Sequence, residues 1–525
     1  MKNYIILIVF ASLLMGCSKD FLDRYPKDAL SPSTFWKSKK DADLALTALY
    51  RGFESSDNLL YRDCGSDNGY NNFPWEGWRP IGDGTVSPSN TGSSYYDYTI
   101  INRCNEFLKS AQDLNFDGKD IYLAQARFLR AYRYYILTVN YGDVPLVTTV
   151  FASPDDAKVP RDDKAQVQQF IETELNAIIP VLPASYASAE YGKATKGAAQ
   201  ALLARFYLYF GKYTEALATA KSIEGYSLNP SYTGLFDPEN EQNSEVIMSV
   251  QQVVDLYSID YIPYLPNSIG GWSSVVPTQS LVDAFEMNTG LTIEEAKVAG
   301  TFDEANPYKN RDPRLRASVI YPGAIFNGSN VYSSIVANDN DYYNKADNAS
   351  KTGYNFRKYL NYVRPESAYW NSGADVFIFR YAEMLLTIAE AKVELGQIDD
   401  ELYNAIDAVR ERAGMPKTDR TKYNNQTKLR ELVRRERRVE FAGEGLRRDD
   451  IIRWKIAPTV MNGQLVGVKK GTILSTPQSN GDYDVSLSIN GNVIETRSFA
   501  DKNYLLPIPQ TAIDRNPNLE QNQGY

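Results

Sequence analysis

Apolar residues that recur every three or four positions are the feature that most constrains the fold of this chain. The stretch "IYLAQARFLRAYRYYILTVNYG" (121–142) has this spacing, which predicts an amphipathic helix. The stretch "VFIFRYAEMLLTIAEAKVELG" (376–396) repeats it and closes on Gly396, a helix-ending residue. The apolar sets are Ala124, Phe128, Ala131, Tyr135 and Thr138 in the first stretch and Ile378, Ala382, Leu385, Ala389 and Val393 in the second. Several of these residues are small, so the sequence predicts short helices that pack closely in pairs.

A third stretch, "ALLARFYLYFGKYTEALATAKSI" (201–223), shows how two such helices connect. Its central Gly211–Ala216 segment lies between two amphipathic halves and resembles the turn and second helix of a tetratricopeptide repeat, a unit of roughly 34 residues. Comparable helix pairs fit residues 100–140 and 376–413. Because these pairs are widely separated, we expect a mostly α fold in which tetratricopeptide-like helix pairs form a scaffold with long loop-rich insertions.

The predicted helix pairs are separated by long loop-rich segments, which define the expected domain organisation. The chain has 525 residues but no clean linker and no low-complexity tract, so we expect a single body. The expected parts of the body at 17–525 are helical scaffold mainly at 37–60, 100–222 and 376–455, loop-rich insertions at 61–98 and 224–375, and a C-terminal segment at 456–525. The insertions are rich in Gly, Pro, Asn and aromatic residues. Long ordered loops on a rigid scaffold are common places for binding.

Residues 1–16 predict a lipoprotein signal peptide. A short positive start is followed by an apolar run that ends at Met15, which has signal-peptide length and is too short to span a bilayer as a helix. The sequence "LMGC" (14–17) resembles the bacterial lipobox, whose cysteine is acylated and becomes the first residue. We therefore predict a membrane anchor through lipid on Cys17, with an ordinary secretory signal as the alternative. The following "SKD" (18–20) resembles the tract that sends lipoproteins of Bacteroidetes-type bacteria to the cell surface.

Composition excludes several kinds of chemistry. The chain has no histidine, which removes Ser-His and Cys-His nucleophile pairs, imidazole general bases and histidine-ligated zinc. Its 65 acidic and 56 basic residues give a net charge of −9, which disfavours nonspecific binding to nucleic acid or anionic lipid. After the signal, charges such as Arg205 interrupt the apolar runs before they reach membrane-spanning length.

A basic stretch, "LRELVRRERRVEF" (429–441), invites a nucleic-acid interpretation. Its five arginines are interleaved with glutamates, and Glu431 is spaced to pair with both Arg434 and Arg435 on one helix surface. A phosphate-binding face would not neutralise itself in this way. We therefore predict a structural helix with internal ion pairs and no nucleic-acid partner.

Aromatic and planar polar residues gather in three loop segments, at 61–80, 93–98 and 267–275. Aromatic faces suit the C–H faces of sugar rings, while carboxylate, amide and guanidinium groups take the hydroxyl hydrogen bonds. The candidate ligand-binding residues are Asp67, Asn68, Trp75, Trp78, Arg79, Tyr95, Tyr96 and Trp272. The alternative for each tryptophan is that it fixes its loop onto the scaffold.

The remaining cysteines and acidic residues give no firm site. Cys64 and Cys104 are either a disulfide pair or two separate thiols. The segment 338–348 offers carboxylate and amide oxygens, but Tyr343 occupies the fifth place of an EF-type spacing and the sixth-place glycine is missing. We predict no metal site and no cofactor.

Six motifs, in chain order, resemble the SusD/RagB family of outer-membrane lipoproteins. They are "FLDRYPKDALSPSTFW" (21–36), "ARFLRAYRYYILTVNYGDVPLV" (126–147), "RYAEMLLTIAEAKVELG" (380–396), "VRERAG" (409–414), "RRERRVEFAGEGLRRDDIIRW" (434–454) and "LPIPQTAIDRNPNLEQNQGY" (506–525). The resemblance implies a helical body at the cell surface that acts as lid and nutrient-binding partner of a SusC-like, TonB-dependent transporter, without catalysis. One departure is that family members commonly show Gly-His-Arg-Trp where this chain has Gly445-Leu446-Arg447-Arg448.

The residues and the resemblance together predict a surface lipoprotein that captures glycan fragments and passes them to a transporter barrel. Two alternatives stay open. A peptide-binding protein, as in the RagB branch, would rely on backbone pairing at a groove. A surface glycoside hydrolase would need two carboxylates about 5 to 10 Å apart in a cleft.

Overall fold

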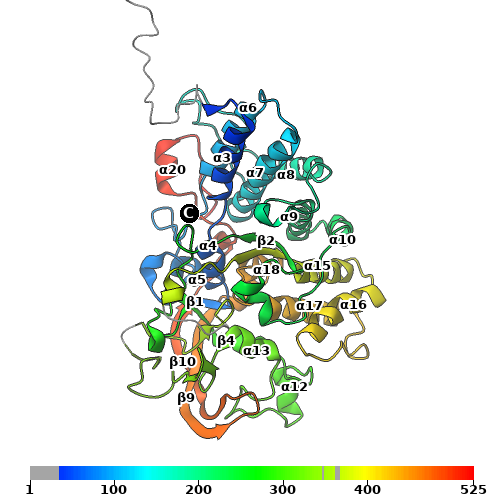
Figure 1. The fold of residues 1–525 in the computed structure, drawn as a ribbon. Helices are drawn as coiled ribbons and strands as arrows, with labels where there is room; N and C mark the ends of the chain where they lie inside the picture. Colours follow the sequence, from blue (N-terminus) through cyan, green and yellow to red (C-terminus); the bar gives the residue numbers. More distant parts are fainter. Residues whose placement is uncertain (1–34, 346–347, 361–366) are drawn as a thin grey trace, which may run out of the picture.

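The computed structural model describes residues 35–345, 348–360 and 367–525, and helices dominate it (Figure 1). The longer helices are α3 (Lys39–Tyr50), α6 (Thr99–Ala111), α7 (Lys119–Tyr141), α8 (Lys164–Ile178), α9 (Lys196–Tyr209), α10 (Tyr213–Lys221), α15 (Tyr381–Glu394), α16 (Asp400–Arg412) and α17 (Gln426–Glu440). Successive helices pack as neighbours, from α6 on α7 through α9 on α10 to α15 on α16. The mostly α scaffold of tetratricopeptide-like pairs is therefore confirmed.

Left-handed glycines close the predicted turns. Gly211, between α9 and α10, has φ +73°, and Gly396, after α15, has φ +70°. A side chain is strained in this backbone region, whereas glycine adopts it freely. The side chain of Asp399 then accepts a hydrogen bond from the Leu402 amide at 3.1 Å and caps α16.

From Phe128 to its C-terminal end, helix α7 is buried on all sides. Every residue from Phe128 to Tyr141 is buried, because α3, α6, α8 and α9 all pack against it. A helix surrounded in this way must satisfy its polar side chains internally, and Arg130 does so with Glu174 at 2.8 Å. The sequence pattern predicts an apolar surface on one side of this helix only, whereas the structure buries its second half on every side.

Short helices and small sheets fill the space between the scaffold helices. The short helices are α4 (Ser56–Tyr61), α5 (Arg79–Asp83), α11 (Gln279–Ala284), α12 (Ile293–Val298), α13 (Pro313–Ser318), α14 (Ser367–Trp370), α18 (Arg447–Arg453), α19 (Ala457–Val460) and α20 (Gln510–Arg515). The antiparallel strand pairs are β1 (Gly69–Asn71) with β3 (Val275–Pro277), β2 (Val246–Val250) with β8 (Val376–Arg380), β4 (Val319–Ile320) with β7 (Asn355–Phe356), β5 (Ile325–Phe326) with β6 (Asn330–Val331), and β9 (Gly463–Pro477) with β10 (Tyr483–Arg497). The β9–β10 hairpin runs down to the lower edge of the molecule in Figure 1.

The arginine-rich helix α17 is tied to other elements by ion pairs. Its partners are Glu394 for Arg430 and, at 4.0 Å, for Arg434, Glu286 for Arg435, Asp450 for Arg437 and Asp67 for Arg438. The partners of Arg434 and Arg435 therefore lie elsewhere in the fold, and Glu431 is exposed. The helix is structural, as predicted. However, these arginines form ion pairs with carboxylates of other elements, and not with glutamates one turn away on the same helix.

Buried carboxylates of α17 complete this network. Glu440 contacts Arg380 at 2.7 Å, Arg314 at 3.2 Å and also Arg412. Burial raises the pKa of Glu440, but these guanidinium groups overcome it and hold the pKa well below its usual range. Removing one member of such a network leaves an uncompensated buried charge, which typically costs 3–5 kcal/mol.

In the part of the chain that the structure describes, no helix is both long and apolar enough to cross a bilayer. Cys17 and the signal peptide lie outside the described residues.

Candidate functional site

The β1–β3 pair brings two of the aromatic loops to the same end of a short ribbon. Asn71 pairs with Val275, and beyond the strands the amide of Asn72 donates to the Ser274 carbonyl at 2.8 Å. The chain leaves β1 toward Trp75 and enters β3 from Trp272. Pairing of distant segments therefore places both tryptophans in one region of the surface.

Trp75 is the more exposed of the two. Its side chain lies 78% exposed and stacks on Phe73, with ring centroids 4.9 Å apart and an interplanar angle of 25°. The short turn that carries it ends at Gly77, which has φ +84°, and Asn71 Nδ2 donates to Glu76 Oε2 at 2.6 Å. The ring is thus held on a fixed turn while one face remains open to a ligand.

A second exposed aromatic pair lies on the neighbouring loops. Trp272 is 37% exposed and Trp370, at the end of α14, is 48% exposed. Their rings meet edge to face at 6.1 Å. Gly271 sets the path of this loop, because a Cβ there would lie 2.1 Å from the Leu265 carbonyl oxygen. We name the four side chains Phe73, Trp75, Trp272 and Trp370 the aromatic surface.

Sequence reasoning had not selected Phe73 or Trp370. The sequence does contain a signal for each residue, because Phe73 precedes Pro74 and Trp370 precedes an Asn-Ser-Gly turn. A large aromatic residue beside turn residues rarely occupies a regular core position. What the sequence could not reveal is which of these rings stay outside the core.

Trp78, Tyr95 and Tyr96 lie inside the fold. Trp78 is 3% exposed and stacks on Tyr61 at 6.4 Å, and buried Tyr95 meets its edge at 5.8 Å. Half-buried Tyr96 packs against Tyr141 of α7 at 5.1 Å. These rings fix the 61–98 insertion onto the scaffold, which is the alternative that the sequence offered for the tryptophans, and the structure does not bring them to the aromatic surface.

Asp67 and Asn68 also serve the interior. Arg447 contacts both carboxylate oxygens of Asp67, with Nε–Oδ1 2.8 Å and Nη2–Oδ2 2.9 Å, and Arg438 approaches Oδ2 to 2.9 Å. Burial raises the pKa of Asp67, but the two guanidinium groups more than offset it and lower the pKa to about 2. Asn68 Oδ1 accepts a hydrogen bond from Arg438 at 2.8 Å.

Arg79 caps the outer side of β1. Its Nη2 donates to the carbonyl of Asn71 at 2.9 Å and to that of Asn72 at 2.5 Å, and its guanidinium lies over the Tyr70 ring at 4.9 Å. The side chain thus occupies the backbone acceptors at the end of β1 and stiffens the turn that carries Trp75.

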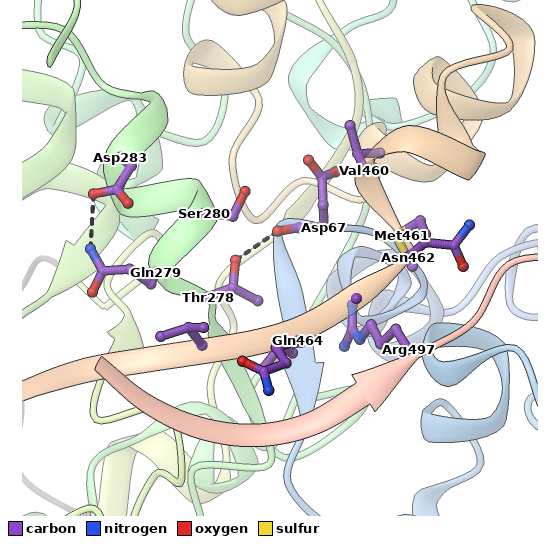
Figure 2. A pocket seen from close by; sticks show the side chains of 13 residues that line it. Asp67, Thr278, Gln279, Ser280, Asp283, Val460, Met461, Asn462, Gln464 and Arg497 are labelled. Carbon is purple, nitrogen blue, oxygen red and sulfur yellow. Dashed lines mark hydrogen bonds between the residues drawn. The ribbon is translucent and has the colours of Figure 1, made fainter. Parts of the chain in front are cut away.

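A polar pocket of about 330 Å³ opens at the opposite end of the β1–β3 ribbon (Figure 2). Asp67, Thr278, Ser280, Asp283, Gln464 and Arg497 line it. Gln279 Nε2 donates to Asp283 at 2.9 Å, and the Thr278 hydroxyl donates to the Asp67 carbonyl at 2.6 Å. The pocket wall is therefore largely occupied with internal hydrogen bonds.

Cys64 and Cys104 are separate free thiols. Both are buried, and burial raises the pKa of the Cys104 thiol to about 12. Of the two possibilities that the sequence left open, the structure therefore shows unpaired cysteines.

Comparison with known proteins agrees with this architecture. Residues 20–208 match a family described as starch-binding and associating with the outer membrane, and residues 220–525 match the SusD family. A solved SusD-like carbohydrate-binding protein from Bacteroides fragilis is 30% identical, with a TM-score of 0.81 over 93% of this chain and 100% of its own.

Two relatives show the same relationship along the sequence. SusD-like protein P25 of Formosa agariphila is 26% identical over 495 residues, covering 86% of this chain and 90% of that protein. The starch-binding protein SusD of Bacteroides thetaiotaomicron is 25% identical over 437 residues, covering 77% of this chain and 72% of that protein.

The fold and the matches together define a class of outer-membrane-associated carbohydrate-binding proteins. Within that class, the chain belongs to the SusD family.

Proposed function

We propose that this protein captures glycan chains at the cell surface on its aromatic surface and delivers them to a SusC-like, TonB-dependent transporter in the outer membrane. The observation that carries the proposal is the pair of exposed aromatic contacts, Trp75 on Phe73 and Trp272 on Trp370, on loops joined by the β1–β3 ribbon. Membership of the SusD family supports the same role.

The geometry of the aromatic surface suits an oligosaccharide. A sugar ring presents a C–H face that packs on an indole, and two indoles at separate positions offer contacts to more than one sugar unit. Large exposed apolar surfaces are otherwise a liability for a secreted protein. A ligand that covers these rings explains why they are held on fixed turns and not buried.

Peptide capture by strand addition is disfavoured at this ribbon. An added strand needs free backbone acceptors, whereas the carbonyls of Asn71 and Asn72 accept hydrogen bonds from Arg79. The position of Arg79 thus supports a glycan in preference to a peptide as the ligand.

The pocket beside Asp67 does not have the features of a hydrolase site. A glycosidase needs one carboxyl that carries a proton and a second that is free to act as base or nucleophile. Arg438 and Arg447 keep Asp67 ionised, and their guanidinium groups contact both of its carboxylate oxygens. Asp67 is therefore not free to act as base or nucleophile beside Asp283. We therefore propose a binding protein that is not an enzyme.

Affinity electrophoresis of the protein in gels that contain plant, host or microbial polysaccharides tests the binding role. We expect one polysaccharide to retard the protein, and Trp75→Ala and Trp272→Ala to abolish the retardation. Val298→Ala, which removes a 92% exposed side chain on α12, is the matched control. Retardation that survives both tryptophan variants would exclude the aromatic surface as the binding site.

Transporter delivery has a separate test. Protein solubilised from native membranes in mild detergent should co-purify with a TonB-dependent barrel, and recovery of the protein without a barrel would count against delivery. Release of reducing sugar by the purified protein would contradict the non-enzymatic assignment.

A further inference from the structure

A second hollow, of about 350 Å³, adjoins the polar pocket of Figure 2 and shares Ser280 and Asp283 with it. Four arginines line this hollow, and we name it the arginine pocket. They are Arg434, Arg435, Arg438 and Arg447. Because the polar pocket opens at the end of the β1–β3 ribbon away from Trp75, the arginine pocket is separate from the aromatic surface.

The four arginines converge for two structural reasons. Arg434 and Arg435 precede Arg438 on α17 by four and three positions, and residues with this spacing lie on the same side of a helix. Arg447 comes from α18, and its Nη2 and the Nη2 of Arg438 both lie 2.9 Å from the same oxygen, Oδ2 of Asp67. The shared oxygen makes these two guanidinium groups neighbours.

The carboxylates behind these arginines are shared. Each contacts two guanidinium groups: Asp67 contacts Arg438 and Arg447, Glu286 contacts Arg435 and Arg410, and Glu394 contacts Arg430 and, at 4.0 Å, Arg434. Among these, Arg410 has a further partner in Glu436. Burial lowers the pKa of Arg438 to about 10, against the opposing effect of Asp67 and with a further contribution from Arg447. This wall of the pocket therefore keeps an excess of positive charge.

Several N–H donors on the same wall have no protein acceptor. Within the described part of the chain, the Nη1 groups of Arg435, Arg438 and Arg447 donate no hydrogen bond to the protein, and none of them is sealed from solvent. The Nε–H of Arg434 is buried without a partner. A guanidinium group has five donors, so these arginines can bind an additional acceptor without giving up the ion pairs that hold them in place.

The facing wall has the opposite character. The Ser280 hydroxyl accepts a hydrogen bond from Arg438 Nη2 at 2.9 Å, and Asp283 and Glu294 are exposed carboxylates that line the same pocket. Carboxylates accept hydrogen bonds from hydroxyl groups, whereas they would repel a bare inorganic anion. The two walls together suit a molecule that carries an anionic group beside hydroxyl groups.

We propose that the arginine pocket binds an acidic sugar unit, whose carboxylate accepts hydrogen bonds from the arginines while its hydroxyl groups donate to Asp283 and Glu294. Arginine is the side chain best suited to bind a carboxylate in this way. The proposal rests on the glycan-capture role proposed above and narrows the ligand to glycans that contain uronic acid. Because the whole chain carries a net charge of −9, an acidic glycan is not attracted in general, and its recognition depends on this local positive wall.

Calorimetric titration of the full chain with matched oligosaccharides tests the proposal. The probes are oligogalacturonate, oligoglucuronate and alginate oligosaccharides, each paired with its carboxyl-reduced, neutral counterpart. We expect at least one acidic probe to bind about tenfold more tightly than its neutral counterpart, with a preference that declines as sodium chloride is added. If no acidic probe binds more tightly than its counterpart, the proposal is wrong.

Two variants locate the preference. Arg434→Gln removes the arginine with the weakest ion pair, so the fold should persist while the preference for the acidic probe falls several-fold. Ser280→Glu, at an exposed position, places a competing carboxylate beside Arg438 and should abolish the preference. Lys428→Gln removes an exposed cation of α17 outside the pocket and should leave the preference unchanged. A preference of wild-type size in both Arg434→Gln and Ser280→Glu would exclude the arginine pocket as the site.

The same titrations separate this inference from the proposed function. Binding of neutral glycans that depends on Trp75, without any preference for acidic probes, would overturn the arginine pocket and leave glycan capture intact. An acidic preference that is lost in Arg434→Gln but unaffected by Trp75→Ala would support the arginine pocket and count against the aromatic surface.

Discussion

Arg447 donates two hydrogen bonds to the carboxylate of Asp67, at 2.8 and 2.9 Å, and so joins the 61–98 insertion to α18. The pair lies 380 positions apart in the sequence and is buried with Arg438 beside it. The residue that sequence reasoning offered as a ligand contact thus anchors the loop that presents the aromatic surface.

Asp67→Ala should lower the free energy of unfolding by about 3–5 kcal/mol, because it leaves Arg438 and Arg447 buried without their counter-charge. The folded pKa of Asp67, about 2, lies below the unfolded value. Its contribution is therefore complete above about pH 4 and is lost as the pH falls toward 2, an effect of about 2 kcal/mol. Urea unfolding of both proteins between pH 2 and 7 measures this, with the exposed Glu431→Gln as control. A difference between the two proteins that stays constant down to pH 2 would contradict the assignment.

Trp78→Ala should destabilise the fold by about 3–5 kcal/mol, because it removes a buried ring between Tyr61 and Tyr95. Trp75→Ala should leave the unfolding temperature unchanged, since that ring is 78% exposed, and should weaken glycan binding about tenfold. Thermal unfolding and calorimetric titration with the retarding polysaccharide separate the two effects. Equal losses of stability in both variants would show that Trp75 is a packing residue.

Gly271→Ala should impair binding through the loop alone. The added Cβ would clash with the Leu265 carbonyl and displace Trp272 from Trp370. We expect a several-fold weaker affinity with a circular dichroism spectrum like that of the wild type. Gly52→Ala, at an exposed glycine where a Cβ would meet only side-chain atoms, the nearest at 3.3 Å, controls for the loss of a glycine elsewhere. Unchanged affinity in Gly271→Ala would mean that Trp272 does not contact the ligand.

Asp375→Asn should stabilise the protein at neutral pH. Burial raises the pKa of Asp375 to about 6, against hydrogen bonds from Ser249 and the Gln252 amide that lower it. A carboxyl with a raised folded pKa favours folding most below its unfolded pKa, and this contribution is lost as the pH rises through 6. The gain from the amide should therefore be up to about 3 kcal/mol at pH 8 and near zero at pH 4. Denaturant titrations at both pH values test this, with exposed Asp113→Asn for comparison.

Cys17→Ala should release the protein from the membrane. The prediction of a lipid anchor rests on the sequence "LMGC" (14–17), and stable anchoring requires more than one acyl chain. Metabolic labelling with a fatty-acid analogue, followed by fractionation, checks it. A variant that still incorporates the label would place the lipid elsewhere, and Cys104→Ala is the control for loss of a cysteine.

The scaffold was predictable because its information is local. The spacing of apolar residues from Ala124 to Thr138 and the glycine at Gly211 specify helices and turns without reference to distant residues. The site was less predictable, because the same residue type serves opposite roles three positions apart: Trp75 is exposed and Trp78 is buried. That difference depends on tertiary contacts, because Trp78 packs between Tyr61 and Tyr95, and no local sequence pattern predicts these contacts. The partners of α17 were missed for the same reason.

The ion network around Glu440 has a consequence for the order of folding. Helix pairs such as α9 and α10 close through contacts between near neighbours, which form quickly. Glu440 instead needs Arg314, Arg380 and Arg412, which arrive from separate segments only after long loops have closed. The last buried charges are therefore neutralised late, so a chain that has built its helices still exposes unmatched carboxylates until the segments that carry these arginines have packed against α17.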